Sequence, residues 1–342
     1  MSTVSQMLRE IREIPDAVAR LLDRSGAAIA KAAADASARS PAFLATVARG
    51  SSDHAATYLK YACELTLGLP VASIGPSVAS IYHAPLRLAG GICVVISQSG
   101  KSPDIVEMAR AATSGGALTV ALTNDPASPL AGAAGRVIDI AAGPELSVAA
   151  TKTFVTSAVA ALALVAEWAG DAALLAAIHA LPGALDRAAR VDWGGLTDRL
   201  ATAESVFTLG RGPGFAVSGE AALKLKETCR IHAENYSSAE VLHGPVTIVG
   251  QGFPVLAFAA ADAAEESVAT VADALAGKGA EVFVTSDRVR RARPLPGVRT
   301  DHPLTDPIAL IVSFYAMVEA VARARGIDPD RPRHLSKVTE TT

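Results

Sequence analysis

The chain has 342 residues, of which 50% are hydrophobic and 19% are charged, and its formal net charge is −3. This composition is typical of a soluble α/β protein with enough apolar surface for about two domains, and it argues against a disordered or fibrous chain. The slight acidic excess leaves no basic face for a nucleic-acid backbone, so we expect no nucleic-acid partner.

The first half of the chain alternates short apolar runs with helical stretches. Strands are predicted over 43–47, 92–96 and 119–123. A helix is predicted over 53–67, and a second over 103–112 has proline at its first turn. Strands that alternate with helices in this way predict a parallel sheet covered on both faces.

The second half repeats this order of elements. A strand over 205–209 runs through an Arg-Gly turn into a helix over 219–229, as the strand over 43–47 runs through Arg49-Gly50 into its own helix. The segment 117–123 likewise has a counterpart at 280–286. The repetition predicts a tandem duplication.

The predicted domains follow from this repetition. They are an N-terminal helical segment over 1–40, a first subdomain over 41–180, a second subdomain over 195–325 and a C-terminal tail over 326–342. Pro15 and Gly26 are expected to interrupt the N-terminal helix, and breaks are expected at Pro182 and Gly194 in the connection between subdomains.

Neither a membrane nor a metal is expected. The most apolar run, 154–166, is shorter than the roughly 20 residues of a membrane span and predicts a buried core helix. The first residues lack the uninterrupted apolar region of a signal peptide. Three cysteines without a Cys-x-x-Cys spacing favour a reduced, cytoplasmic protein without a metal site or another cofactor.

The turn after the predicted strand over 92–96 has the composition of a phosphate site. Ser97, Ser99 and Ser102 supply hydroxyls, Gln98 lies among them, and Gly100 permits close backbone approach. A turn of small residues that opens a helix also offers backbone N–H groups to an anion. The alternative is that the turn merely caps the helix.

Two further serines follow the first predicted strand. Ser51 and Ser52 also stand between a strand and a helix. In a parallel sheet they are expected beside the turn that begins at Ser97, at the carboxyl ends of the strands, where ligands bind in such folds. In the second copy the corresponding loop reads Ala-Ala-Ala-Asp over 259–262, so only the first copy retains the hydroxyls.

A possible acid/base site lies in the second half. Proton transfer between C1 and C2 of a sugar needs a base, a group that opens the ring and a cation or donor for the developing oxyanion. Glu227, His243 and Lys224 could fill these three positions. Lys224 and Glu227 share a helix face, which equally fits a solvated ion pair, and a histidine before Gly-Pro is often an ordinary loop residue.

With these residues the chain resembles the tandem sugar isomerase (SIS) domains that form the isomerase half of the glucosamine-6-phosphate synthases. The resemblance spans nearly the whole chain, and the stretch 209–245 is its most specific part. The motifs occur in order: Ser97-Gln98-Ser99-Gly100, Glu145-Leu146-Ser147-Val148-Ala149-Ala150-Thr151-Lys152, Leu209-Gly210-Arg211-Gly212, Ala222-Leu223-Lys224-Leu225-Lys226-Glu227, Ile231-His232-Ala233-Glu234, His243-Gly244-Pro245 and Pro332-Arg333-His334-Leu335-Ser336-Lys337.

The resemblance implies a fold and a partner. Each half would be a flavodoxin-like SIS subdomain with a parallel five-stranded sheet between helices, and the protein would be a homodimer that binds a small-molecule sugar phosphate. The residues that would hold the phosphate are Ser51, Ser52, Ser97, Gln98, Ser99 and Ser102. Val148 and Ala149 would contact the sugar through their backbone.

The resemblance also implies the catalytic roles. Glu227 would move the proton between C1 and C2, and Lys224 would assist at the oxygen. His243, from the neighbouring subunit, would open the ring. Lys337, on a tail that closes over the site, would form a Schiff base with the open-chain ketose. Without the resemblance, a lysine so near the end of the chain indicates only a solvated tail.

Departures from the synthases indicate the reaction. No glutaminase domain is expected before the isomerase half, Lys101 stands where the synthases have an acid, and Ala150 replaces a hydroxylated residue. We therefore expect a stand-alone enzyme that converts glucosamine 6-phosphate to fructose 6-phosphate and ammonia. The alternatives are another phosphosugar isomerase, a fructosamine-6-phosphate deglycase, an ammonia-dependent synthase, or a sensor that binds a sugar phosphate without turnover.

Overall fold

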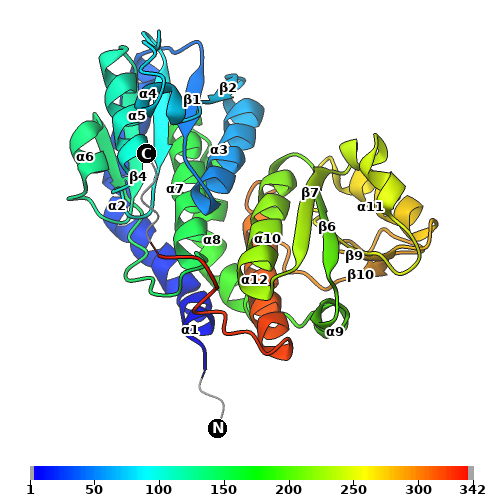
Figure 1. The fold of residues 1–342 in the computed structure, drawn as a ribbon. Helices are drawn as coiled ribbons and strands as arrows, with labels where there is room; N and C mark the ends of the chain where they lie inside the picture. Colours follow the sequence, from blue (N-terminus) through cyan, green and yellow to red (C-terminus); the bar gives the residue numbers. More distant parts are fainter. Residues whose placement is uncertain (1–3, 338–342) are drawn as a thin grey trace. The chain divides into compact units, whose positions relative to one another are not determined.

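The computed structural model describes residues 4–337 and contains two five-stranded sheets (Figure 1). All described strand pairs within these sheets are parallel. The chain divides into two compact units, each built on one sheet. The first-sheet unit consists of the described residues 16–145, 152–179 and 335–337. The second-sheet unit consists of residues 4–15, 146–151 and 180–334. The predicted α/β class with two tandem parallel sheets is confirmed.

The first sheet has the strand order β2-β1-β3-β4-β5. Its strands are β1 (Leu44–Val47), β2 (Val71–Ser73), β3 (Ile92–Ile96), β4 (Leu118–Thr123) and β5 (Arg136–Asp139). The helices of this unit are α2 (Ile14–Ala38), α3 (Ser51–Leu67), α4 (Ser77–Ser80), α5 (Pro103–Ser114), α6 (Pro129–Ala133), α7 (Lys152–Ala169) and the first part of α8 (Ala172–Ala188).

Helices cover both faces of this sheet because its central strands are apolar on both sides. Every residue of β1, β3 and β4 is buried. Ala45, Cys93 and Ala121 belong to one core cluster that includes residues of α4, α5 and α6. Helices α3 and α7 pack against each other, and α7 also contacts β4. This burial on two faces explains why the predicted strands lack alternating polar residues.

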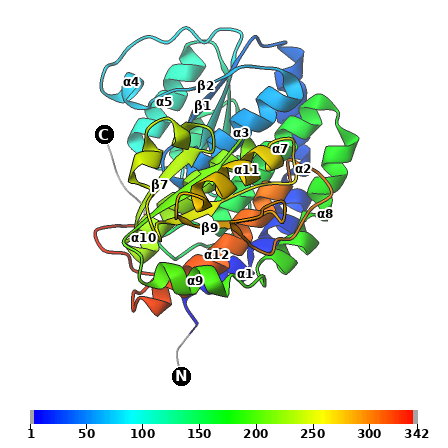
Figure 2. The same cartoon turned by 90° about the vertical axis from the view of Figure 1, so that its right-hand side faces the viewer.

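The second sheet has the order β10-β9-β8-β6-β7. Its strands are β6 (Ser205–Gly210), β7 (His232–Ser237), β8 (Pro254–Ala257), β9 (Glu281–Val284) and β10 (Arg293–Pro294). The helices of this unit are α1 (Gln6–Arg12), the end of α8, α9 (Gly194–Ala201), α10 (Pro213–Cys229), η1 (Glu240–Leu242), η2 (Pro245–Ile248), α11 (Glu265–Ala276) and α12 (Asp306–Ala324). Figure 2 gives a second view of α9 to α12 and of strands β7 and β9.

The two sheets have the same topology, as the predicted duplication requires. Numbered within its own unit, each sheet has the order 2-1-3-4-5. The turns after the first strands also match: Gly50 has φ 57° and ψ −134°, and Gly212 has φ 56° and ψ −135°. Only glycine adopts such a backbone readily, so a glycine turn of the same conformation precedes the helix in both copies.

Two predicted helix breaks are wrong. Helix α8 continues through Pro182, although proline removes one helical hydrogen bond, because Leu181 and Leu185 on either side of it are buried. Helix α2 likewise continues through Gly26. The predicted interruption at Pro15 is confirmed, since α1 ends at Arg12 and α2 begins at Ile14 with Pro15 in its first turn. The break near Gly194 is confirmed, since α9 begins there.

Two described helices, α7 and α12, are long and apolar enough to cross a membrane by length and composition alone. Within the protein, 83% of the α7 window and 78% of the α12 window are buried. The apolar run over 154–166 is therefore a buried core helix, as predicted from its length.

Candidate functional site

The predicted phosphate residues lie around the point where the order of the first sheet reverses. Strand β1 lies between β2 and β3, so the chain leaves β1 toward one edge of the sheet and leaves β3 toward the other. Ser51 and Ser52 are the first residues of α3, which follows β1, and Ser97 begins the turn after β3. Such a reversal opens a crevice at the carboxyl ends of the two strands, which is the usual ligand position in open α/β sheets.

The turn after β3 is tightly folded. The Ser97 hydroxyl accepts a hydrogen bond from the Gly100 N–H at 3.2 Å, and the Ser99 hydroxyl accepts one from the Lys101 N–H at 3.3 Å. Gly100 has φ 61°, and a Cβ there would lie 2.2 Å from the Ser128 Oγ. No larger residue fits this position, so the turn is fixed before any ligand arrives.

Gln98 and Ser102 are the remaining predicted phosphate residues of this turn. The Gln98 carbonyl accepts a hydrogen bond from the Asn124 N–H at 3.0 Å, which ties the turn to the end of β4. Ser102 is the N-cap residue of α5, yet its side chain makes no capping hydrogen bond. Simple helix capping therefore does not account for the Ser102 hydroxyl.

An ion pair joins the loop after β1 to the loop after β3. Arg49, which follows β1, pairs with Asp104 in the first turn of α5. Asp104 is fully buried, and its other oxygen accepts a hydrogen bond from the Ile105 N–H at 2.9 Å. Burial also raises the pKa of Asp53, which follows the two serines of α3. This edge of the sheet thus holds charged side chains that its apolar strands do not predict.

Helix α10 carries a buried charged cluster in the second-sheet unit. Lys224 is fully buried and forms an ion pair with Glu227, which is only partly buried. The ammonium nitrogen of Lys224 also lies 3.6 Å from a carboxylate oxygen of the fully buried Glu220. The Tyr315 hydroxyl of α12 donates to the same Glu220 oxygen at 3.0 Å. The predicted pair is therefore not a solvated surface pair.

This cluster has the parts of a proton-transfer site. A lysine between two carboxylates is a fixed positive charge, because Glu220 balances it from the interior. Glu227 is more exposed than Lys224 and can reach a substrate proton. The nearby cation can stabilise negative charge that develops on a substrate oxygen.

The segment before α7 is held by a second buried carboxylate. Glu10 of α1 accepts hydrogen bonds from the N–H groups of Leu146 and Ser147, the latter at 3.2 Å. These bonds fix the backbone just before Val148 and Ala149, the residues predicted to contact the sugar. Ala149 is buried and Val148 is partly buried, so a ligand there would meet a rigid backbone edge.

Lys337 pairs with Glu145 in the first-sheet unit. Its ammonium nitrogen lies 3.0 Å from a carboxylate oxygen of Glu145, whose side chain is fully buried. The same carboxylate accepts hydrogen bonds from the Thr153 N–H at 3.0 Å and the Thr153 hydroxyl at 2.6 Å, at the start of α7. The predicted tail lysine is thus anchored and not simply solvated.

His243 lies in an exposed loop of the second-sheet unit. It is exposed and follows η1 in a loop flanked by the exposed side chains of Leu242 and Ile248. Lys224 and Glu227 share its unit, and it makes no side-chain contact with them among the described interactions. The predicted site residues therefore divide between the two units, with the phosphate residues and Lys337 in the first-sheet unit and the others in the second-sheet unit.

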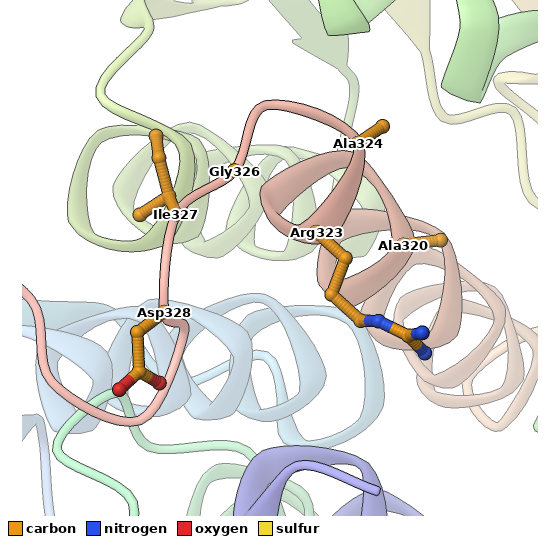
Figure 3. A pocket seen from close by; sticks show the side chains of 6 residues that line it. All are labelled: Ala320, Arg323, Ala324, Gly326, Ile327 and Asp328. Atoms are coloured by element: carbon orange, nitrogen blue, oxygen red, sulfur yellow. The ribbon is translucent and has the colours of Figure 1, made fainter. Parts of the chain in front are cut away.

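One hollow of the second-sheet unit carries none of the predicted residues. A depression of about 620 Å³ at the end of α12 is lined by Ala320, Arg323, Ala324, Gly326, Ile327 and Asp328 (Figure 3). Within residues 4–337, no group of three or more His, Cys, Asp or Glu side chains could hold a metal ion.

Comparison with known families decides the classification. The SIS domain family matches residues 43–167 and 199–288, which together make up more than half of the chain and include the first sheet and every strand of the second sheet except β10. The chain belongs to the SIS-domain family. The predicted resemblance to tandem SIS domains is confirmed.

Among relatives of this SIS protein is the isomerizing glutamine–fructose-6-phosphate aminotransferase of Symbiobacterium thermophilum, which is 32% identical over 97% of this chain. The match spans 58% of that relative, so this chain is shorter than the curated enzymes it matches. A solved structure from Silicibacter pomeroyi, provisionally named a phosphosugar isomerase, is 64% identical. It covers 96% of this chain and 100% of its own, with a TM-score of 0.93.

A more distant structure shares the fold alone. The glucosamine-6-phosphate deaminase of Thermotoga maritima is 21% identical to this SIS protein and has a TM-score of 0.82. It covers 98% of this chain and 100% of its own. The tandem SIS architecture thus occurs in a deaminase as well as in the isomerizing aminotransferases.

Sequence reasoning missed three of the side chains that hold the site together. Glu220 was detectable, because an acid four residues before Lys224 lies on the same helix face. Glu10 and Asp104 gave no comparable signal, since each acts on a segment that is distant in the sequence.

Proposed function

We propose that this protein is a sugar-phosphate isomerase that acts on an amino sugar phosphate, converting glucosamine 6-phosphate to fructose 6-phosphate and ammonia. The observation that carries the proposal is the buried Glu220–Lys224–Glu227 cluster on α10. A protein that only binds its ligand has no need to keep a lysine buried between two carboxylates, because burying these charges is costly. The family membership and the serine-rich turn after β3 support the same proposal.

The proposed reaction begins with ring opening by His243. Glu227 then removes the proton from C2 and returns it to C1, which converts the open-chain amino aldose into an imine at C2. Lys224 stabilises the negative charge that develops on the sugar oxygen. Lys337 in its neutral form adds to C2 and displaces ammonia, and water then releases the ketose and regenerates the amine. No oxidant, metal or redox cofactor enters this balance.

The phosphate would stay at the first sheet throughout. Ser51, Ser52 and the turn that begins at Ser97 would bind it through hydroxyls and N–H groups. We further propose a cytoplasmic homodimer in which His243 completes the site of the neighbouring subunit. Leu242 and Ile248 are exposed beside His243, and an interface at this loop would cover both apolar side chains.

The first test is ammonia release from glucosamine 6-phosphate by the purified protein, with fructose 6-phosphate measured in parallel. Lys337→Ala and Glu227→Gln should each abolish release. Glu227→Gln should still bind the sugar phosphate, because its neutral amide keeps the shape of the carboxylate. Binding by wild-type protein without turnover of any sugar phosphate would refute the isomerase and favour the sensor.

A second candidate is isomerisation of a sugar phosphate without an amino group. The 64% identical protein, provisionally named a phosphosugar isomerase without a stated amino sugar, favours it. Glu227 and Lys224 would act in the same way, and Lys337 would have no ammonia to displace. A panel of aldose and ketose phosphates separates the two candidates: the second predicts turnover that survives Lys337→Ala.

A further inference from the structure

The predicted phosphate site has many donors but no positive charge. Its residues contribute hydroxyls, one amide and backbone N–H groups. A phosphate monoester carries about 1.5 to 2 negative charges at neutral pH, and neutral donors alone leave this charge uncompensated. Two cations lie at this edge of the sheet, namely Arg49 and Lys101.

Arg49 is held in place by a buried acid. Its partner Asp104 is 0% exposed and belongs to the first turn of α5, directly after the serine-rich turn. The Arg49 side chain itself is 46% exposed, so it is anchored by this ion pair and is still accessible to solvent. A guanidinium has five N–H donors in a rigid fork, and one ion pair leaves donors for a second anion.

Lys101 is held much more weakly. Its side chain is 59% exposed, and its nitrogen lies 3.8 Å from an oxygen of Asp125, which is also well exposed. A solvated pair of this kind fixes neither side chain. Of the two cations, Arg49 alone is oriented before a ligand binds.

The second copy of the fold provides an internal comparison. Arg211 and Gly212 follow β6 with nearly the same glycine backbone as Gly50, so the Arg-Gly turn itself belongs to the fold. Arg211 is exposed, as Arg49 is, but Glu266, which occupies the second position of α11 as Asp104 does in α5, is exposed too and forms no ion pair with Arg211 among the described residues. The hydroxyl-rich turn is also absent from that copy. The anchored arginine thus occurs in the copy that has the serines.

We infer that Arg49 is a phosphate-binding residue, whose guanidinium donates to the phosphate of the substrate, and that Asp104 is the positioning residue that holds it there. This inference rests on the proposed function and deepens it. It makes the site selective for a dianionic sugar phosphate over a neutral sugar. Asp104 acts through Arg49 and touches no substrate.

The test measures binding of fructose 6-phosphate and of inorganic phosphate by calorimetry, together with kcat and KM for the substrate that the wild-type protein turns over. Arg49→Gln should raise the Kd for both ligands at least tenfold and raise KM with little change in kcat. Arg49→Lys should recover part of the lost affinity, because lysine restores the positive charge but not the planar set of guanidinium donors. Asp104→Asn should weaken binding less than Arg49→Gln does.

Arg136→Gln is the matched control. Arg136 also pairs with an aspartate, Asp35, at 2.6 Å and is 40% exposed, but it lies on the edge strand β5. Its replacement should leave the Kd within twofold of wild type. If Arg49→Gln unfolds because Asp104 loses its partner, the double variant with Asp104→Asn removes both charges and gives the same binding comparison.

The outcomes separate the inference from the proposed function. If the wild-type protein binds and turns over a sugar phosphate, and Arg49→Gln keeps its Kd and KM within twofold, the inference alone is wrong. If the wild-type protein binds neither fructose 6-phosphate nor inorganic phosphate, the proposed function fails and the inference fails with it. A drop in kcat at unchanged KM would assign Arg49 to another step and also overturn the inference.

Discussion

Replacing Gly50 or Gly212 with alanine should destabilise the protein by the same amount. Both residues end the turn after the first strand of their unit, with φ and ψ values that agree within about 1°. A Cβ at either position would meet no atom within 4 Å. The cost of each substitution therefore comes from the backbone conformation alone and not from a steric clash.

The magnitude follows from this backbone. Holding a residue other than glycine in so sparsely populated a region costs about 1–3 kcal/mol. Alanine also stiffens the unfolded chain, which returns about 0.4–1 kcal/mol. We expect a net loss of about 1–2 kcal/mol for each variant.

The two tryptophans allow each unit to be followed separately. Trp168 lies in α7 of the first-sheet unit, and the buried Trp193 lies in the second-sheet unit, where its indole N–H donates to the Pro296 carbonyl at 2.8 Å. Urea unfolding is recorded by fluorescence in a Trp193→Phe background for Gly50→Ala and in a Trp168→Phe background for Gly212→Ala.

If the two variants lose unfolding free energy by amounts that differ by more than about 1 kcal/mol, the reasoning is refuted, since identical backbone strain cannot give unequal costs. A substitution that costs nothing would refute it as well. Binding separates the two turns: Gly50→Ala should also weaken phosphate binding, because even a small relaxation of the strained turn shifts Arg49 and the start of α3.

Other substitutions and reagents test the burial of charged and reactive groups. Lys224→Met should lower the free energy of unfolding by about 3–5 kcal/mol, because it leaves the Glu220 carboxylate buried without its cation, and adding Glu220→Gln should restore part of the loss in urea denaturation. Burial raises the pKa of Cys63 and of Cys93 to about 12, so a thiol reagent at pH 8 should label neither residue in the native protein and both after denaturation; labelling of the native protein would contradict their burial. Burial also raises the pKa of Asp53, so its carboxylate destabilises the folded state once ionised, and Asp53→Asn should raise the melting temperature at neutral pH. That gain should shrink as the pH falls through the raised pKa and disappear below the ordinary value of 3.8, and a gain that persists in acid would contradict it.

Strands buried on both faces were predictable from the sequence, and polar edge strands were not. The strand over 92–96 was predicted with the bounds of β3, because five consecutive apolar residues have no other plausible role in this pattern. Strand β7, His232–Ser237, was missed, since its sequence is mostly polar. It lies at the edge of the second sheet and pairs only with β6, so most of its side chains stay partly or fully exposed.

Helix continuity depends on packing that sequence signals do not reveal. Proline and glycine lower helix propensity by known amounts, and this led to predicted breaks at Pro182 and Gly26. Leu181 and Leu185 near Pro182 are buried, as are Leu21 and Ile29 on either side of Gly26, and their burial outweighs the local cost. A single sequence reveals the low helix propensity of proline and glycine, but it does not reveal the side-chain burial that compensates for it.

The site was predictable where it consists of residues close in sequence. The turn beginning at Ser97 and the pair of Lys224 and Glu227 are each contained in one short stretch. The ion pairs of Arg49 with Asp104 and of Lys337 with Glu145 join distant stretches, and only the folded chain brings their members together. The roles of these residues in catalysis stay predictions until the substitutions are made.

The hydrogen bonds that anchor α1 to the C-terminal part of the chain affect the order in which the protein folds during synthesis. The first two N–H groups of this helix donate to Asp330 at 2.7 and 2.8 Å, and the Ser5 hydroxyl donates to Glu319 at 2.6 Å. These acceptors leave the ribosome more than three hundred residues after α1. Until then α1 lacks these two acceptors, so the helix that places Glu10 against the backbone before Val148 is not fully fixed. The second sheet is therefore completed after the first, and a nascent chain with a finished first sheet still lacks an ordered sugar-contacting segment.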